Sequence, residues 1–142
     1  MSPGQVQPEI IERHLTALRG ALGELERHAD ASVRSLRTDT SLRWAVERGL
    51  LLCIQNALDI ASHVASTEGH DPPTYGDSID SLVASGVLPA EFGENFRAVA
   101  GFRNIIVHGY LDLDLNRVAR FLGDDLNDFE VFAQHIERWL EG

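Results

Sequence analysis

The chain has 142 residues, of which 44 % are hydrophobic and 7 % aromatic, so its composition excludes a disordered polypeptide. Its formal net charge is −10, and all 12 basic residues are arginine. This acidic balance argues against a general nucleic-acid binder, because such proteins rely on clustered cations. Any contact with an anion must therefore occur at a local surface lined by arginine. The length suits one domain over residues 1–142 with a real core.

The sequence gives no sign of export or of a membrane segment. Its N-terminus lacks a basic start followed by an apolar stretch, and the longest apolar run, Leu50–Ile54, is far below the ~20 residues that span a bilayer. The single cysteine, Cys53, cannot form an internal disulfide and lies within an apolar helical pattern. We therefore expect a cytoplasmic protein with a buried thiol, which disfavours the thiolate that a nucleophile needs.

The first predicted helix spans roughly five turns. Its apolar residues alternate spacings of four and three, the period of one helical face. They are Ile11, Leu15, Leu18, Leu22, Leu25 and Ala29. Pro8 and Glu9 suit the first turn of this helix. The pattern stops at Asp30, and we expect a loop over Asp30–Thr38.

A second, long helix is predicted from Asp39 or Thr40, either of which can cap its start, to about Ser66. Its middle is apolar on all sides, which indicates a central buried helix. Thr67–Gly76 contains two glycines and two prolines and should form a loop. A short helix is then expected over Ser78–Ser85.

Gly86 fits the end of that short helix, and Leu88–Pro89 begins another helical pattern that Gly109 is placed to stop. Its apolar positions are Phe92, Phe96, Val99, Phe102 and Ile106. The last helix should begin near Asp114. Its apolar face comprises Leu115, Val118, Leu122, Leu126, Phe129, Phe132, Ile136 and Leu140. The sequence thus predicts an all-α fold, an antiparallel bundle of four long helices plus a short one.

Four chemically distinctive side chains occur within eight residues where one of these helices ends. They are Arg103, Asn104, His108 and Tyr110. The planar guanidinium of arginine gives two parallel hydrogen bonds to phosphate oxygens. Histidine titrates near neutral pH and can move a proton in either direction. Together they suit cleavage of a phosphodiester that carries its own 2′-hydroxyl nucleophile, without a metal.

The spacing of this motif sets a geometric condition. Residues five apart on a helix differ by ~140°, so Arg103 and His108 do not share a face of one straight helix, whereas Asn104 and His108 do. Either the helix ends near Val107 and frees His108, or two copies of the motif meet across a dimer axis.

The motif and its helical setting resemble the HEPN superfamily, and more closely the HepT-type toxins that are paired with minimal nucleotidyltransferases. The resemblance covers nearly the whole chain. The matching features are Arg43 with Glu47-Arg48, Asn56, Asp59, Thr74-Tyr75-Gly76, Leu82, Gly86-Val87-Leu88-Pro89, Arg103-Asn104, His108 and Tyr110. It implies a HEPN-like helical fold and a homodimer whose paired motifs line one cleft.

The resemblance also implies a function and roles for residues. The chain would be the toxin of a type VII-like toxin–antitoxin pair and a metal-independent endoribonuclease. Arg103 would hold the scissile phosphate, His108 would act as general base or acid, and Asn104 would orient either partner. The cognate minimal nucleotidyltransferase antitoxin would add AMP to Tyr110, which would block RNA by bulk and like charge.

Five further polar residues are candidates for support of the motif. Arg43, Glu47 and Arg48 form either a supporting group or a solvated face with an intra-helix ion pair. Asn56 and Asp59 lie in an apolar stretch, where a polar side chain needs partners, so they either support the motif or satisfy the core.

Other site chemistries are weaker. His63, His70 and Asp71 suggest a metal site, but the last two lie in a loop rich in Gly and Pro, so we expect neither metal nor cofactor. The alternative function is a non-catalytic HEPN binding subunit that complexes with a nucleotidyltransferase and presents a nucleotide or protein to it. The acidic composition keeps that alternative open, because an RNA-cutting surface is usually more basic. A plain helical adaptor is a third possibility.

Overall fold

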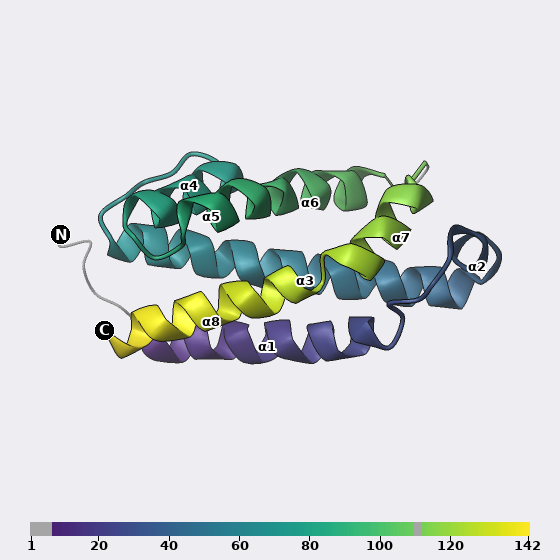
Figure 1. Ribbon diagram of the computed structural model, residues 1–142, viewed down its shortest axis with the longest axis horizontal. Helices are drawn as coiled ribbons and strands as arrows, with labels where there is room; N and C mark the ends of the chain where they lie inside the picture. The colour runs from purple at the N-terminus through teal and green to yellow at the C-terminus, as the bar shows by residue number, and fades with distance from the viewer. Residues whose placement is uncertain (1–6, 110–111) are drawn as a thin grey trace.

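The computed structural model describes residues 7–109 and 112–142, and over those ranges every regular element is a helix. The helices are α1 (Pro8–Glu26), α2 (Val33–Thr38), α3 (Thr40–Thr67), α4 (Tyr75–Ala84), α5 (Ala90–Phe96), α6 (Ala98–His108), α7 (Leu115–Asp124) and α8 (Asn127–Glu141). Figure 1 shows α1, α3, α6 and α8 lying lengthwise, each reversing the direction of the one before. The predicted all-α antiparallel bundle is confirmed.

The pairing of α1 with α3 forms the base of the bundle. Every α1 residue of the predicted stripe up to Leu25 is buried, and α1 ends at Glu26, about one turn earlier than expected. The Asp39 carboxylate caps α3 by accepting a 3.1 Å hydrogen bond from the Leu42 amide. A side chain at Gly49 would lie 2.7 Å from Leu25 Cδ2, so glycine permits this close approach of the two helices.

The loop predicted over Asp30–Thr38 was wrong, because it contains helix α2. The Ser32 hydroxyl accepts a 3.0 Å hydrogen bond from the Ser35 amide, and the Ser35 hydroxyl accepts one of 2.9 Å from the Ser32 amide. This reciprocal cap fixes a six-residue helix that buries Leu36. So short a helix offers too few apolar positions to establish a period.

Helix α4 begins three residues before the predicted Ser78. The Thr74 hydroxyl caps it by accepting a 3.1 Å hydrogen bond from the Asp77 amide. Tyr75 therefore opens a helix instead of closing a loop, which proves important for the site. At the other end Gly86 has φ +77°, and the following amide donates to Leu82, so the predicted glycine stop is confirmed.

Two of the predicted long helices are each divided into two. Helices α5 and α6 meet at Arg97, and α7 and α8 meet at Asp125 and Leu126. Neither junction contains proline or glycine, and the helical spacing of apolar residues continues across both. The sequence therefore shows no sign of either division. The change of direction between α7 and α8 is visible in Figure 1.

Helix α3 lies at the centre and packs against α1, α2, α4, α6 and α8. Its Cys53 is fully buried, as predicted, and burial raises the pKa of the thiol to about 12, which disfavours the thiolate. Elsewhere in the core, Phe96 of α5 stacks on Phe132 of α8 with ring centroids 4.9 Å apart. Of the helices that the structure describes, none is long and apolar enough to span a membrane.

Candidate functional site

Arg103 lies where α3, α4 and α6 converge, and two contacts fix its guanidinium. Its Nε donates a 2.8 Å hydrogen bond to Gln55 Oε1 on α3. Its central carbon lies 5.2 Å from the centroid of the Tyr75 ring, at the first residue of α4. A cation over an aromatic face is attracted by the ring quadrupole. Helices distant in sequence therefore hold one cation in place.

Gln55 is the hub of this arrangement. Its Nε2 donates to Asp59 Oδ1 at 2.8 Å and to the Tyr75 hydroxyl at 3.2 Å. With the amide nitrogen occupied by those two acceptors, the amide oxygen is left to face Arg103. Asp59 is thus linked to Arg103 through a neutral amide and forms no contact ion pair with it.

The charge of Arg103 is left uncompensated by this network. Over residues 7–109 and 112–142, Arg103 forms no ion pair within 4.0 Å, and its Nη1 makes a long contact of 3.4 Å with Asn104 Oδ1. Asn104 itself is exposed. Most of the guanidinium N–H groups therefore stay available for an anion, next to an amide that can join them.

His108 is the last residue of α6 and is exposed. Helix α6 ends at His108, one residue beyond the predicted end near Val107, and His108 itself keeps its helical position. Arg103 and His108 point ~140° apart around one helix axis within a single chain. Gly109 then ends the helix as predicted, and a side chain there would collide with the carbonyl oxygen of Ile105.

The five supporting candidates separate into different places. Asn56 hydrogen-bonds His14 on α1 at 2.8 Å and the Leu52 carbonyl at 2.8 Å, so it faces away from Arg103. Arg43 pairs with Glu47 at 3.7 Å and donates to the Leu36 carbonyl at 3.3 Å. This contact is the intra-helix ion pair that was one of the two alternatives for these residues. Burial raises the pKa of Glu47.

Glu47 and Arg48 also border an exposed apolar surface between α3 and α6, which we call the Trp44 patch. Its residues are Trp44, Glu47, Arg48, Leu51, Ile106 and Val107. The Trp44 side chain is 65 % exposed and Val107 is 36 % exposed, two of the three large exposed hydrophobic residues in the described ranges. The patch reaches the residue next to His108. A tryptophan this exposed, flanked by charged side chains, makes the patch a candidate surface for contact with another molecule.

Gln55 and Tyr75 were not predicted as site residues. The interpretation favoured Asn56 because it is polar within an apolar stretch. Its neighbour Gln55 lies ~100° further round α3, on the side that α6 covers. The spacing of four between Gln55 and Asp59 could have indicated this face. Tyr110, the predicted modification site, lies outside the described residues.

No set of three His, Cys, Asp or Glu side chains is arranged to hold a metal ion in the part of the chain that the structure describes. Of the weak metal candidates, His70 has its Nε2 at 2.9 Å from the Ser85 hydroxyl. That contact gives His70 a structural partner at the end of α4.

Comparisons with known proteins match most of the chain. The family model described as "Ribonuclease HepT-like" matches residues 18–136. The chain is 26 % identical to mRNA nuclease HepT of Shewanella oneidensis over 131 residues, which are 91 % of this chain and 97 % of that protein. It is 26 % identical to tRNA nuclease HepT of Aphanizomenon flos-aquae over 136 residues, covering 95 % and 92 %.

A solved structure shares the fold over nearly the whole chain. It is the tri-AMPylated Shewanella oneidensis HEPN toxin in complex with MNT antitoxin. Its TM-score is 0.80 at 25 % identity, covering 91 % of this chain and 97 % of the toxin.

Proposed function

Because this chain belongs to the HepT-like ribonuclease family, we propose that it is the toxin of a type VII-like toxin–antitoxin pair that cleaves RNA without a metal. The observation that carries the proposal is the state of Arg103. Its guanidinium is held by Gln55 and Tyr75 and paired with no carboxylate of the described residues. Such a positioned cation is suited to a phosphate.

The reaction that these residues support is attack by the ribose 2′-hydroxyl on the adjacent phosphorus. His108 accepts the hydroxyl proton as general base while the oxygen–phosphorus bond forms. Arg103 binds the non-bridging oxygens, on which negative charge increases. The bond between phosphorus and the 5′-oxygen then breaks, and this oxygen takes a proton from water, which gives a 2′,3′-cyclic phosphate and a 5′-hydroxyl end. Asn104 orients the phosphate beside Arg103.

A composite site in a homodimer reconciles this chemistry with the helix geometry. Arg103 and His108 of one chain point in different directions around the axis of α6, so in this proposal His108 of a second copy reaches the phosphate that Arg103 binds. The Trp44 patch supports this pairing, because it is exposed and includes Val107, the residue before His108. Two copies that bury this patch against each other bring their α6 helices together.

Mixing two inactive variants tests the composite site. Arg103→Ala and His108→Ala dimers are each expected to be inactive on RNA in EDTA. After the two are unfolded and refolded together, activity should return to about one quarter of wild type, since half of randomly paired dimers are mixed and each carries one intact site. Light scattering should give twice the 15.7 kDa chain mass.

Two results would contradict this proposal. A mixture that stays inactive, although mass spectrometry of the native complex shows mixed dimers, would place both residues in one subunit. Activity that EDTA abolishes and added divalent cation restores would overturn the metal-independent reaction. As a control, mixing Arg103→Ala with a second preparation of Arg103→Ala should restore nothing.

We also propose that a minimal nucleotidyltransferase antitoxin neutralises the chain by adding AMP to Tyr110. Support comes from the position of Tyr110 in the motif and from the AMPylated toxin in the similar solved complex. Added AMP brings bulk and negative charge near the phosphate site. Coexpression with such a nucleotidyltransferase should add adenylyl mass to the wild type and none to Tyr110→Phe. Labelling of both proteins alike would refute the assignment.

The second candidate function is a non-catalytic subunit that presents a nucleotide or protein to the nucleotidyltransferase. The net charge of −10 favours it, because RNA-cutting surfaces are usually basic. It predicts that purified wild type cleaves no RNA and that Arg103→Ala leaves complex formation with the nucleotidyltransferase unchanged.

A further inference from the structure

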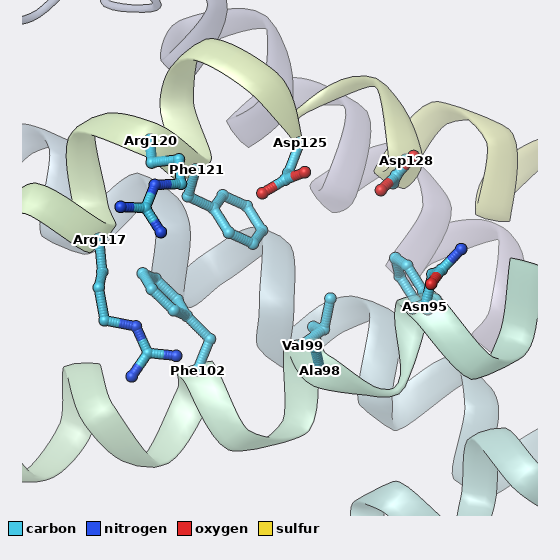
Figure 2. Close-up of a pocket in the computed structure, with 10 residues that line it drawn as sticks. Asn95, Ala98, Val99, Phe102, Arg117, Arg120, Phe121, Asp125 and Asp128 are labelled. Carbon is cyan, nitrogen blue, oxygen red and sulfur yellow. The ribbon is translucent and has the colours of Figure 1, made fainter.

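A cavity of about 430 Å³ opens between α5–α6 on one side and the α7–α8 bend on the other (Figure 2). We call it the α6–α7 cavity. Its main lining residues are Phe102, Arg117, Arg120, Phe121, Asp125 and Asp128. Its volume falls within the range of roughly 300–1,000 Å³ that is typical of small-molecule sites. Arg103 does not line it, so it is separate from the candidate site described above.

One side of the α6–α7 cavity is cationic. Arg117 and Arg120 lie about one turn apart on α7, and in Figure 2 both extend on the same side of the phenylalanine pair. Neither forms an ion pair within 4.0 Å or a side-chain hydrogen bond to any residue of the described ranges. Two adjacent unpaired guanidiniums in a chain of charge −10 are suited to a phosphate.

The middle of the cavity is aromatic and apolar. Phe102 and Phe121 stack with centroids 4.8 Å apart and planes inclined by 20°. Val99 and Phe96 complete the apolar lining. A planar ligand ring can stack on such a surface and bury its apolar face there.

The far side of the cavity carries hydrogen-bond acceptors. Figure 2 shows Asp125 and Asp128, with Asn95, on the side of Phe121 away from the arginines. Burial raises the pKa of both carboxyls; for Asp125 the neighbouring carboxylates add to the shift, and the charge of Arg120 opposes it. Partly dehydrated carboxylates gain from a ligand that donates N–H groups to them.

We infer that the α6–α7 cavity binds a nucleoside monophosphate whose base carries an exocyclic amine. The arginine pair takes the phosphate, the aromatic surface takes the base, and the carboxylates accept from the amine. This order of anion, planar ring and donor follows the order of groups along the cavity. Adenine, cytosine and guanine nucleotides carry such an amine, whereas uridine monophosphate carries only carbonyl groups on its base.

The test is titration of the full-length protein with AMP, followed by calorimetry and by two-dimensional NMR. The shifted signals should come from α6, α7 and the start of α8. The double variant Arg117→Ala/Arg120→Ala should bind AMP at least about tenfold more weakly. The matched control Arg13→Ala/Arg27→Ala changes the net charge equally at exposed positions on α1 and at its C-cap, and should bind as the wild type does.

Ligand variants test each end of the cavity. Adenosine, which lacks the phosphate, should bind at least about tenfold more weakly than AMP and be insensitive to loss of the arginine pair. UMP should bind more weakly than AMP, and Asp125→Asn/Asp128→Asn should reduce that preference. The inference is overturned if AMP shifts no signal of the cavity, or if the arginine pair and its α1 control behave alike.

Arg103→Ala keeps this test independent of the proposed nuclease. AMP binding that persists in Arg103→Ala supports the cavity whether or not the protein cleaves RNA. Binding that Arg103→Ala abolishes would place the nucleotide at the candidate site and overturn the inference.

Two sources of the nucleotide can be distinguished, and this last comparison rests on the proposed modification of Tyr110. If AMP attached to the chain fills the cavity, modified protein should no longer bind free AMP, and its α6–α8 signals should already be shifted. If free nucleotide is the ligand, modified and unmodified protein should bind AMP equally. Both results support the cavity.

Discussion

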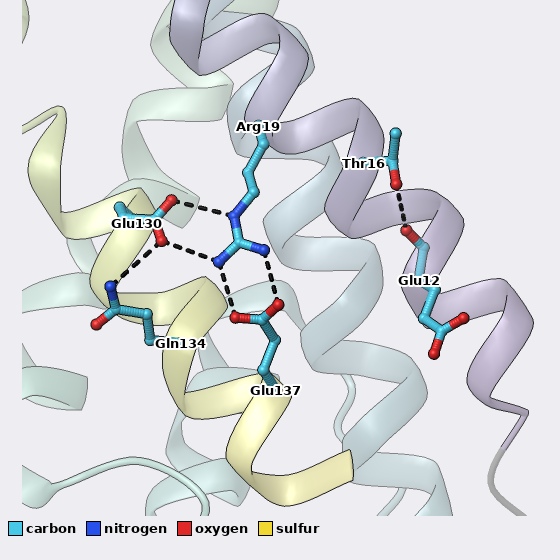
Figure 3. Close-up of polar contacts among 6 residues, drawn as sticks. All are labelled: Glu12, Thr16, Arg19, Glu130, Gln134 and Glu137. Carbon is cyan, nitrogen blue, oxygen red and sulfur yellow. Dashed lines mark hydrogen bonds and ion pairs between the residues drawn. The ribbon is translucent and has the colours of Figure 1, made fainter. Parts of the chain in front are cut away.

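Arg19 and Arg103 are the same residue type in opposite electrostatic surroundings. Arg19 on α1 lies between two carboxylates of α8, as Figure 3 shows. It donates to Glu130 at 3.1 and 2.9 Å and to Glu137 at 2.7 and 2.8 Å. Arg103 on α6 donates one short bond to the neutral amide of Gln55 and lies over Tyr75.

This difference separates a structural arginine from one that is available to a ligand. The Arg19 donors are occupied on both edges, and the two carboxylates raise the pKa of its guanidinium further above the physiological range. An external anion would have to displace Glu130 or Glu137. At Arg103 a neutral amide and a ring fix the geometry without neutralising the charge. In an acidic chain, the partners of an arginine therefore decide whether it joins helices or binds a phosphate.

The largest expected effect is at Arg103. Arg103→Ala should lower RNA cleavage by about 10²–10³-fold, because it removes the donor that stabilises the phosphate in the transition state. Thermal unfolding should shift little, since the lost hydrogen bond goes to a partly exposed amide. Single-turnover cleavage and circular dichroism measure the two quantities. Arg19→Ala should have the reverse profile, and equal loss of cleavage in both variants would refute the contrast.

Gln55→Glu should give Arg103 a carboxylate partner, as Arg19 has, in place of the neutral amide. A carboxylate at 55 would form a contact ion pair with Arg103 and compete with phosphate, so cleavage should fall by about tenfold or more. The matched control is Gln134→Glu, which places the same change beside Glu130 on α8 and should leave cleavage unchanged. Full activity of Gln55→Glu would show that the neutrality of the amide is unimportant.

Arg19→Met should act on stability alone. It keeps an apolar stem of similar length but leaves Glu130 and Glu137 close together without their cation, which should cost about 1 kcal/mol at these half-exposed positions. Urea denaturation measures the change. Arg27→Met removes an exposed pair with Glu24 and should stay within about 0.5 kcal/mol of wild type. A larger effect at Arg27 than at Arg19 would contradict this reading.

The smallest effect is a dependence on acid. Hydrogen bonds from Arg19 hold the pKa of Glu130 and of Glu137 below the ordinary value of 4.5. Their contribution to stability is therefore fully present above pH 4.5 and is lost as the pH falls through the lowered values. Urea midpoints between pH 3 and pH 6 should fall less steeply for Arg19→Met than for wild type. Parallel curves would show that the pair contributes nothing.

Much of the fold could be predicted, because helical periodicity is local. The α1 stripe from Ile11 to Leu25, the Asp39 cap of α3 and the glycine stops at Gly86 and Gly109 are each confirmed. The divisions at Arg97 and at Asp125 could not be predicted, since both junctions keep helical spacing and contain no helix breaker. The Phe96–Phe132 stack joins α5 to α8, a contact between residues far apart in the sequence that helical spacing does not show.

The sequence by itself determined the helical class, the buried face of each long helix and the residues of the motif, because spacing and side-chain chemistry are encoded within a few turns. Only the tertiary structure decided that Gln55 and Tyr75 hold Arg103, that Asn56 turns to His14, and that Arg117 and Arg120 meet one cavity. The reason is physical. The face of a helix on which a residue lies is a local property of the sequence. Which other helix packs against that face is set by the packing of the whole chain.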